Sequence, residues 1–123
     1  MCSSDLKLTG FKTILYRPPY GTQGTFTSDH IKTMSKSDLK CWDWNIDTYD
    51  WGLSTADEIL SRVKRLMKNG ENLDNAVILF HERNVTVRAL PSVIKYYQDL
   101  GYTFLPYHPD NHFTLNFLDN PDL

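Results

Sequence analysis

The 123-residue sequence lacks the features that mark a membrane-spanning protein or a secretory precursor. None of its apolar runs approaches the roughly 20 residues that a bilayer-spanning helix needs. Its first ten residues, MCSSDLKLTG, contain no apolar core of a signal peptide, so we expect any export signal to lie upstream. The sequence therefore predicts no membrane segment in this chain.

The sequence also has little excess charge of either sign and few cysteines. The formal net charge is −2 and no stripe of Lys and Arg opposes it, which argues against a nucleic-acid partner. The two cysteines, Cys2 and Cys41, have no CxxC spacing, so they indicate neither a disulfide framework nor a zinc knuckle. We expect two free thiols, with Cys41 buried in a strand, and they do not fix the compartment.

The remaining composition, 41% hydrophobic and 23% charged, is typical of one modest globular domain. Four short apolar runs predict strands at Lys12–Tyr16, Leu39–Ile46, Ala76–Phe80 and Tyr102–Leu105. Three stretches with helical spacing of apolar residues predict helices within Thr22–Ser37, Thr55–Lys68 and Thr86–Leu100. Strands that alternate with helices predict an α/β fold with parallel βα units and right-handed crossovers.

Residues 107–123 form a C-terminal tail that we expect to pack back as an extended segment. The tail contains His108 and His112, but Pro109 lies between them, so we expect surface histidines and no helical pair of metal ligands. The strand Lys12–Tyr16 is expected to leave a sheet edge open. An open edge predicts a marginally folded chain or self-association through that edge.

Chemically capable residues directly follow the first three predicted strands. Arg17 follows the first strand, Asp47 and Asp50 follow the second, and His81 follows the third. In parallel sheets, binding sites gather outside the carboxyl ends of the strands. We therefore predict that Arg17, Asp50 and His81 belong to one site.

Three motifs at these strand ends resemble the polysaccharide deacetylase family, also called NodB homology or carbohydrate esterase family 4. The family motif RxPY is matched at Arg17–Tyr20, DxxDW at Asp47–Trp51, and LxH at Leu79–His81. The resemblance covers roughly residues 12 to 105, and the tail sequence HFTLNFL is loosely similar to members that act on cell-wall sugars. It implies a partial, distorted (β/α) barrel of the NodB-homology type.

Two further family motifs, TFDD and H[S/T]xxH, do not occur in the sequence. In the family they supply the catalytic base and the ligands of a divalent metal, typically zinc. The resemblance therefore implies that residues 1–123 are a single partial domain, the C-terminal portion of a deacetylase. We expect this chain alone to be inactive and to lack a tight zinc site.

The resemblance implies metal-dependent hydrolysis of N-acetyl groups from a polysaccharide that contains N-acetylglucosamine, such as peptidoglycan or a chitin-like chain. It implies an extracellular or cell-wall location. His81 would be the general acid, Asp50 would hold His81 and favour its protonated form, and Arg17 would orient the base aspartate. The ordinary alternatives are a structural histidine, an aspartate of a turn or helix entry, and a surface arginine.

Three further residues would bind substrate according to the resemblance. The backbone N–H of Tyr20 would meet the oxyanion, and Trp51 and Leu79 would line the pocket for the acetyl methyl group. Ordinary core packing explains Trp51 and Leu79 equally well. Asp47 is expected to cap or brace its loop.

Two other functions are compatible with these residues. Asp47 and Asp50 could be a glycosidase pair, but two acids three positions apart in one loop seldom flank a substrate, and only Glu82 offers a further acid at a strand end. The chain could instead be a non-catalytic carbohydrate-binding or structural remnant of the fold. Its candidate stacking side chains are Trp42, Trp44, Trp51, Tyr20 and Tyr49.

Overall fold

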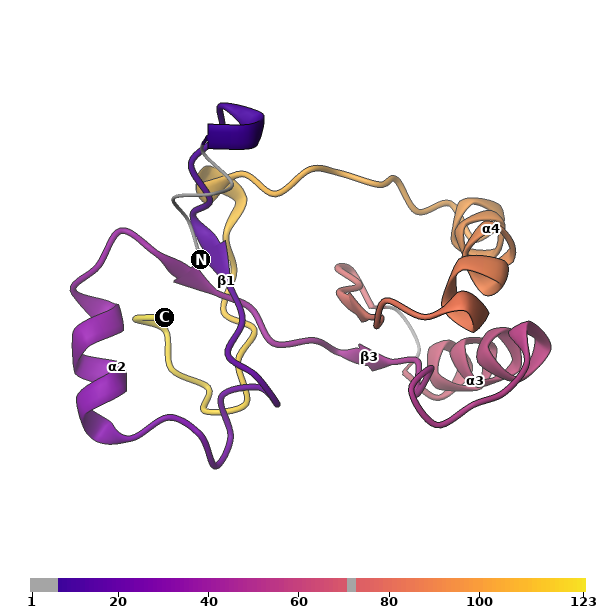
Figure 1. The fold of residues 1–123 in the computed structure, drawn as a ribbon, viewed down its shortest axis with the longest axis horizontal. Helices are drawn as coiled ribbons and strands as arrows, with labels where there is room; N and C mark the ends of the chain where they lie inside the picture. The colour runs from indigo at the N-terminus through magenta and orange to yellow at the C-terminus, as the bar shows by residue number, and fades with distance from the viewer. Residues whose placement is uncertain (1–6, 71–72) are drawn as a thin grey trace. The chain divides into compact units, whose positions relative to one another are not determined.

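The structure, a computed structural model, describes residues 7–70 and 73–123. Cys2 lies outside the described residues. The chain forms two compact units (Figure 1): the first contains Met1–Asp43 and Pro106–Leu123, and the second contains Trp44–Leu105. No helix among the described residues is long and apolar enough to cross a membrane.

The first unit contains β1 (Leu15–Tyr16), α2 (Ser28–Ser35), β2 (Lys40–Cys41) and the 3₁₀ helix η1 (Pro109–Asn111). Strands β1 and β2 pair in parallel, with Tyr16 opposite Cys41. Cys41 is a free thiol and fully buried in β2, as expected, and burial raises the pKa of that thiol to about 11.

Helix α2 is shorter than the stretch 22–37 from which it was predicted. It begins after Thr27, whose hydroxyl accepts a hydrogen bond from the His30 backbone N–H, while the His30 ring accepts one from the Thr27 backbone N–H. These reciprocal bonds fix the first turn of the helix. The residues before Thr27 form turns and bends instead.

The tail packs back onto the segment that follows β2. Trp42 forms an isolated parallel bridge with Leu115, and its Nε1 donates to the Phe113 carbonyl oxygen at 2.9 Å. The His112 ring stacks on Trp42, and its Nε2 lies 3.0 Å from the carbonyl oxygen of buried Leu123. His112 is therefore half-buried, so its predicted surface position is wrong, whereas His108 is exposed.

The second unit contains β3 (Ile46–Asp47), α3 (Ala56–Asn69), β4 (Ile78–Leu79) and α4 (Asn84–Asp99). Strands β3 and β4 pair in parallel, with Asp47 opposite Leu79, and α3 packs beside α4 (Figure 1). The hydrophobic core of this unit comprises the buried side chains Ile46, Ile59, Val63, Met67, Val85, Ala89, Val93 and Tyr97.

Helix α3 begins after Thr55, the first residue of its predicted range, which is its N-cap. The Thr55 hydroxyl accepts from the Glu58 N–H at 3.2 Å, whereas the Glu58 carboxylate accepts from Ser54, one residue before the cap. Ile59, Val63 and Met67, spaced four residues apart, bury one face of the helix. The helical spacing of apolar residues in the sequence therefore identifies the face of α3 that packs against the core.

Helix α4 begins at Asn84, two residues before the predicted start, and continues through Pro91. A proline inside a helix removes one backbone hydrogen bond, because it has no N–H. Pro91 lies on the exposed side, while Ala89, Val93 and Tyr97 bury the opposite face. The helix therefore continues through Pro91 with its apolar face packed on the core.

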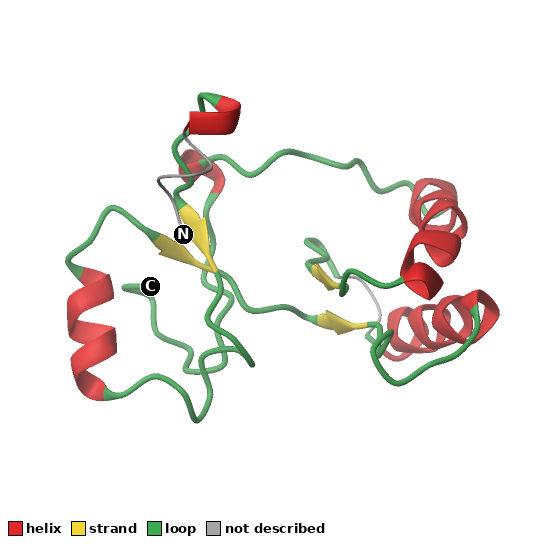
Figure 2. Cartoon of the chain, viewed as in Figure 1, coloured by secondary structure: helices red, strands yellow, loops and turns green. Residues whose placement is uncertain are grey.

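Two predicted strands differ from the structure (Figure 2). The predicted strand Leu39–Ile46 divides into β2 and β3, because the side chains between them form other hydrogen bonds. Asn45, for example, donates to the Asn75 carbonyl and accepts from the Val77 N–H. Residues 102–105 form no strand, since no described strand pairs with them and Leu105 is 76% exposed. The described strands are parallel, as in α/β folds, but close no barrel.

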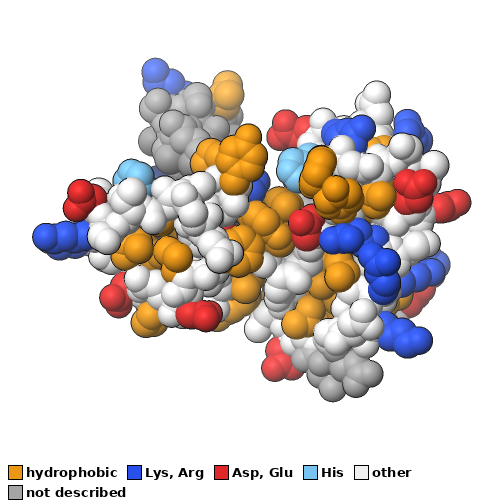
Figure 3. All heavy atoms as spheres, turned by 90° about the horizontal axis from the view of Figure 1, so that it is seen from below, with side chains coloured by type: hydrophobic (Ala, Val, Ile, Leu, Met, Phe, Trp, Pro, Cys, Tyr) orange, Lys and Arg blue, Asp and Glu red, His pale blue; other side chains and the backbone are white. Residues whose placement is uncertain are grey.

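The open edge of Lys12–Tyr16 stays a prediction, and so does self-association. Within the described residues β1 pairs only with β2. Large hydrophobic side chains also lie at the surface among charged ones (Figure 3), including Phe11, Val87 and Leu105.

We predict that Ile59→Ala lowers the free energy of unfolding of the 123-residue chain by about 2–5 kcal/mol, because Ile59 is fully buried between α3 and its neighbours. Val87→Ala, at a position 69% exposed on α4, is the matched control and should change it by less than about 0.5 kcal/mol. Urea denaturation measures both values. Equal losses in the two variants would show that the core is not packed as described.

Candidate functional site

Asp50 is a fully buried carboxylate that binds three groups of the second unit. Its Oδ1 lies 2.7 Å from His81 Nδ1, and its Oδ2 accepts the His81 backbone N–H at 2.6 Å. The Thr86 hydroxyl in α4 also donates to Oδ2. Asp50 follows β3 and His81 follows β4, so the parallel pairing brings the two residues together.

The electrostatics of Asp50 favour its ionised form. Burial alone would raise the pKa of this carboxyl, but the hydrogen bonds from Thr86 and from the backbone and ring of His81 outweigh it. The pKa of Asp50 therefore lies below its ordinary value of 3.8. An ionised Asp50 accepts a hydrogen bond from the Nδ1–H of His81, which leaves Nε2 as the other ring nitrogen of a side chain that is 41% exposed.

The loop between Asp50 and β3 is held by its own hydrogen bonds. Asp47 accepts the Tyr49 backbone N–H at 2.9 Å, and the Thr48 hydroxyl donates to the Leu79 carbonyl at 2.7 Å. The Gly52 N–H donates to the Tyr49 carbonyl at 3.0 Å, and a Cβ at Gly52 would lie 2.5 Å from the Tyr49 ring. Asp47 thus braces the loop, which is the role expected from the sequence.

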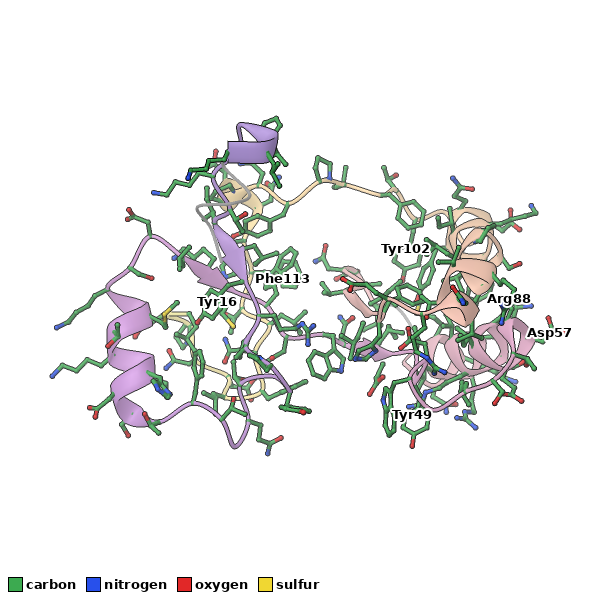
Figure 4. The ribbon with its side chains drawn as sticks, in the orientation of Figure 1. Tyr16, Tyr49, Asp57, Arg88, Tyr102 and Phe113 are labelled. Atoms are coloured by element: carbon green, nitrogen blue, oxygen red, sulfur yellow. The ribbon has the colours of Figure 1, made fainter. Side chains whose placement is uncertain are left out.

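The roles of two arginines and a threonine in this region were not predicted from the sequence. Arg83, at the N-cap of α4, donates to the Asp50 carbonyl, and Arg62 of α3 donates from Nε to the Asp47 carbonyl at 2.8 Å. The Arg62 guanidinium also lies 5.2 Å from the centre of the Tyr49 ring, which lies beside α3 (Figure 4). Thr86 carries no sequence signal, because its role depends on a partner 36 positions away.

The two predicted pocket residues of this unit differ in exposure. Leu79 is 8% exposed and belongs to β4, so its side chain is mainly buried. Trp51 is 54% exposed, and its ring lies 4.3 Å from that of Tyr49 at 59°. Trp51 therefore presents indole surface that a ligand can contact.

Arg17 and Tyr20 lie on a turn of the first unit. The Gly21 N–H donates to the Pro18 carbonyl at 3.0 Å, and Tyr20 has a left-handed φ of 64°. Tyr20 is 90% exposed, and among the described residues none accepts a hydrogen bond from its backbone N–H. Asp50 and His81 lie in the other unit, so a site shared with Arg17 stays a prediction.

Metal ligands do not gather in residues 7–70 and 73–123. No group of three or more His, Cys, Asp or Glu side chains there could hold a metal ion. The described residues therefore do not fit the divalent metal that the motifs imply.

No family model matches the chain, but two curated proteins are similar to part of it. YheN of Bacillus subtilis, named as an inferred polysaccharide deacetylase, is 34% identical over 99 residues, which are 79% of this chain and 35% of YheN. The peptidoglycan-N-acetylglucosamine deacetylase of Bacillus cereus is 30% identical over 106 residues, 84% of this chain and 39% of that protein. The chain thus matches well under half the length of these relatives.

Solved structures give the same relationship. The polysaccharide deacetylase Bc1974 of Bacillus cereus is similar with a TM-score of 0.82 and 27% identity, covering 96% of this chain and 59% of Bc1974. BA3943, described as a CE4 family pseudoenzyme from Bacillus anthracis, is similar with a TM-score of 0.65 and 27% identity, covering 79% of this chain and 32% of BA3943. This fold therefore occurs both in a polysaccharide deacetylase and in a CE4 family pseudoenzyme.

We predict that the stability of the 123-residue chain depends on Asp50 in acid. Because the folded pKa of Asp50 lies below its ordinary value, the stability it adds is fully present above that ordinary value and is lost as pH falls through the lower folded pKa. From about pH 5 to pH 3, the free energy of unfolding should therefore fall less steeply in Asp50→Asn than in the unaltered chain. Chemical denaturation over this range measures the slopes.

At neutral pH, Asp50→Asn should also cost about 1–3 kcal/mol, because buried donors lose their acceptor. Asp74→Asn, at an exposed position of the same unit, is the matched control and should keep the slope of the unaltered chain. Identical slopes for Asp50→Asn and the unaltered chain would contradict the lowered pKa.

Proposed function

Because this chain is related to the polysaccharide deacetylases of the carbohydrate esterase family 4 type, over part of their length, we propose that it carries catalytic residues of such an enzyme. The proposed reaction is hydrolysis of N-acetyl groups on a polysaccharide that contains N-acetylglucosamine. Peptidoglycan is the favoured substrate because the name of one relative specifies it. A chitin-like chain has the same acetamide group.

The observation that carries this proposal is the pairing of His81 with buried Asp50. The 2.7 Å contact holds the imidazole by Nδ1, and the exposed part of the side chain leaves Nε2 for proton transfer. A histidine held in this way suits a general acid, because its pKa in free form lies near working pH and its orientation is fixed in advance.

In the proposed reaction, His81 completes the second half of amide hydrolysis. Water adds its oxygen to the acetyl carbon and gives up a proton to the base aspartate that a TFDD motif would supply. The bond between that carbon and the amide nitrogen then breaks. The proton on His81 Nε2 passes to the leaving nitrogen, which prevents the release of an unstable amide anion. The products are acetate and a free amine on the sugar.

Residues of the two motif turns take binding roles in this proposal. Tyr20 would donate its backbone N–H to the oxyanion, which is supported by the lack of a described acceptor for that N–H. Trp51 would contact the acetyl methyl group with its exposed indole, and Leu79 would support that wall from β4. Arg17 would orient a base aspartate, and the sequence contains no TFDD motif to supply it.

The metal and the location belong to the proposal as well. The resemblance implies a divalent metal, zinc being typical, with ligands from the TFDD and H[S/T]xxH motifs that this sequence lacks. Action on peptidoglycan would place the protein outside the cell or at the cell wall.

A second candidate function is non-catalytic carbohydrate binding. The similarity to a CE4 family pseudoenzyme favours it, since that protein retains the fold while being described as a pseudoenzyme. Trp51 and Tyr20 expose aromatic surface on which sugar rings could stack.

We predict that the 123-residue chain alone releases no acetate from chitooligosaccharides and binds no zinc tightly. The same chain, extended through its upstream coding sequence, should do both if that sequence supplies the two missing motifs. In the extended protein, His81→Ala should lower kcat by about 10²–10⁴-fold, because the leaving amine loses its proton donor. Acetate release and zinc calorimetry on both proteins measure these outcomes.

His108→Ala, at an exposed histidine of the tail, is the matched control and should leave kcat unchanged. Deacetylation by the purified 123-residue chain would overturn the proposal that it is incomplete. If neither protein deacetylates but either binds chitooligosaccharides, the carbohydrate-binding function replaces the catalytic one.

A further inference from the structure

Asp43 is a second buried carboxylate, and the proposed reaction does not use it. It is 1% exposed and lies two residues after β2 in the first unit. Its Oδ1 accepts the Thr22 N–H at 3.0 Å, and its Oδ2 accepts the Thr22 hydroxyl at 2.5 Å and the Phe117 N–H at 2.9 Å. Asp43 thus joins the turn that follows Arg17, the segment after β2, and the C-terminal tail.

The backbone of Asp43 strengthens the same junction. Its own N–H donates to the Leu115 carbonyl at 2.8 Å, so both side chain and main chain bind the tail. The Phe117 N–H also lies 3.2 Å from the Thr22 hydroxyl oxygen. A buried carboxyl group with this many hydrogen-bond donors strongly prefers this fixed geometry over any rearrangement that leaves its oxygens unpaired.

Gly21 shows how closely the turn is pressed against this junction. It has a left-handed φ of 83°, and a Cβ there would lie 2.7 Å from the Phe117 ring and 3.0 Å from Asp43 Oδ1. Any other residue would force the Phe117 ring to shift and would adopt a strained left-handed φ, so glycine is strongly favoured. The position of the turn at Gly21 and Thr22 is therefore set by Asp43 and Phe117.

Tyr20 directly precedes these fixed residues. Its φ of 64° is unusual for a bulky side chain, and the exposed side chain has no packing that would hold it. The peptide that carries the Tyr20 N–H lies inside the turn that the Gly21 N–H closes with the Pro18 carbonyl, and the C-terminal end of that turn is held by the bonds of Thr22 to Asp43. The direction of the Tyr20 N–H therefore depends on Asp43.

We propose that Asp43 is a positioning residue that aims the Tyr20 backbone N–H at the oxyanion, and that the C-terminal tail takes part through the Phe117 N–H. This inference rests on the proposed function of Tyr20. Asp43 itself touches no substrate and acts through Thr22 and Gly21. An oxyanion donor works only at about 2.7–3.1 Å from the developing charge, so a small shift of the turn weakens it.

Kinetics of the extended, active protein test this role. Asp43→Asn places an amide NH₂ against the Phe117 N–H, and Thr22→Val removes the hydroxyl, so each should lower kcat about 10- to 100-fold with KM nearly unchanged. Thr22→Ser keeps the hydroxyl and should retain most of kcat. Asp119→Asn is the matched control, an exposed tail residue with a φ of 49° that asparagine also tolerates.

Amide exchange in the 123-residue chain, followed by NMR, gives a readout that needs no activity. In Asp43→Asn the amide protons of Thr22 and Phe117 should exchange at least about 10-fold faster and the Tyr20 resonance should shift, while α3 amides stay protected. If the unaltered extended protein is inactive, the proposed function fails and the exchange data alone decide the role of Asp43. If Asp43→Asn does not fold, Thr22→Val supplies both readouts.

Two results would overturn the inference. One is unchanged exchange at Thr22 and Phe117 together with an unshifted Tyr20 resonance in both variants. The other is an active protein in which Asp43→Asn and Thr22→Val raise KM or leave kcat at its original value.

Discussion

The second unit depends on the burial of one charge, the carboxylate of Asp50. A charge taken out of water costs several kcal/mol unless its oxygens are paired, so Asp50 is stable only where His81 and Thr86 meet it. This requirement fixes the end of β4 and the first turn of α4 relative to the loop after β3. The Asp50 carboxylate that holds the His81 ring thus also holds the backbone around it in place.

The first unit contains the same arrangement at Asp43, with different partners. Each carboxylate accepts a threonine hydroxyl and at least one backbone N–H from segments more than 20 positions away in the chain. Both also lie where a strand has just ended. Side-chain hydrogen bonds therefore replace part of the backbone ladder, which explains how two-residue strands suffice to position these loops.

Local patterns in the sequence predicted much of this arrangement. The cap at Thr55 and the apolar stripe of α3 follow from spacing alone, and parallel pairing of consecutive strands was enough to expect Asp50 near His81. The break after β2 was not predictable from the spacing of apolar residues in Leu39–Ile46. That spacing depends on neighbouring positions only, whereas Asp43, which follows β2, binds the distant Phe117. Thr86 and Arg83 were missed for the same reason.

Backbone strain links the two motif turns to these carboxylates. Tyr20 and Tyr49 both adopt left-handed φ values, 64° and 54°, which cost an L residue about 1–2 kcal/mol each. Such a conformation persists only where the surrounding hydrogen bonds hold it in place. Tyr20 lies two residues before Thr22, which binds Asp43, and the Tyr49 N–H itself binds Asp47. Strain of this kind is typical of functional turns, since packing alone would select a relaxed backbone. The hydrogen bonds that these buried carboxylates accept therefore stabilise two turns that would otherwise relax, and these turns carry the Tyr20 N–H and the Trp51 indole.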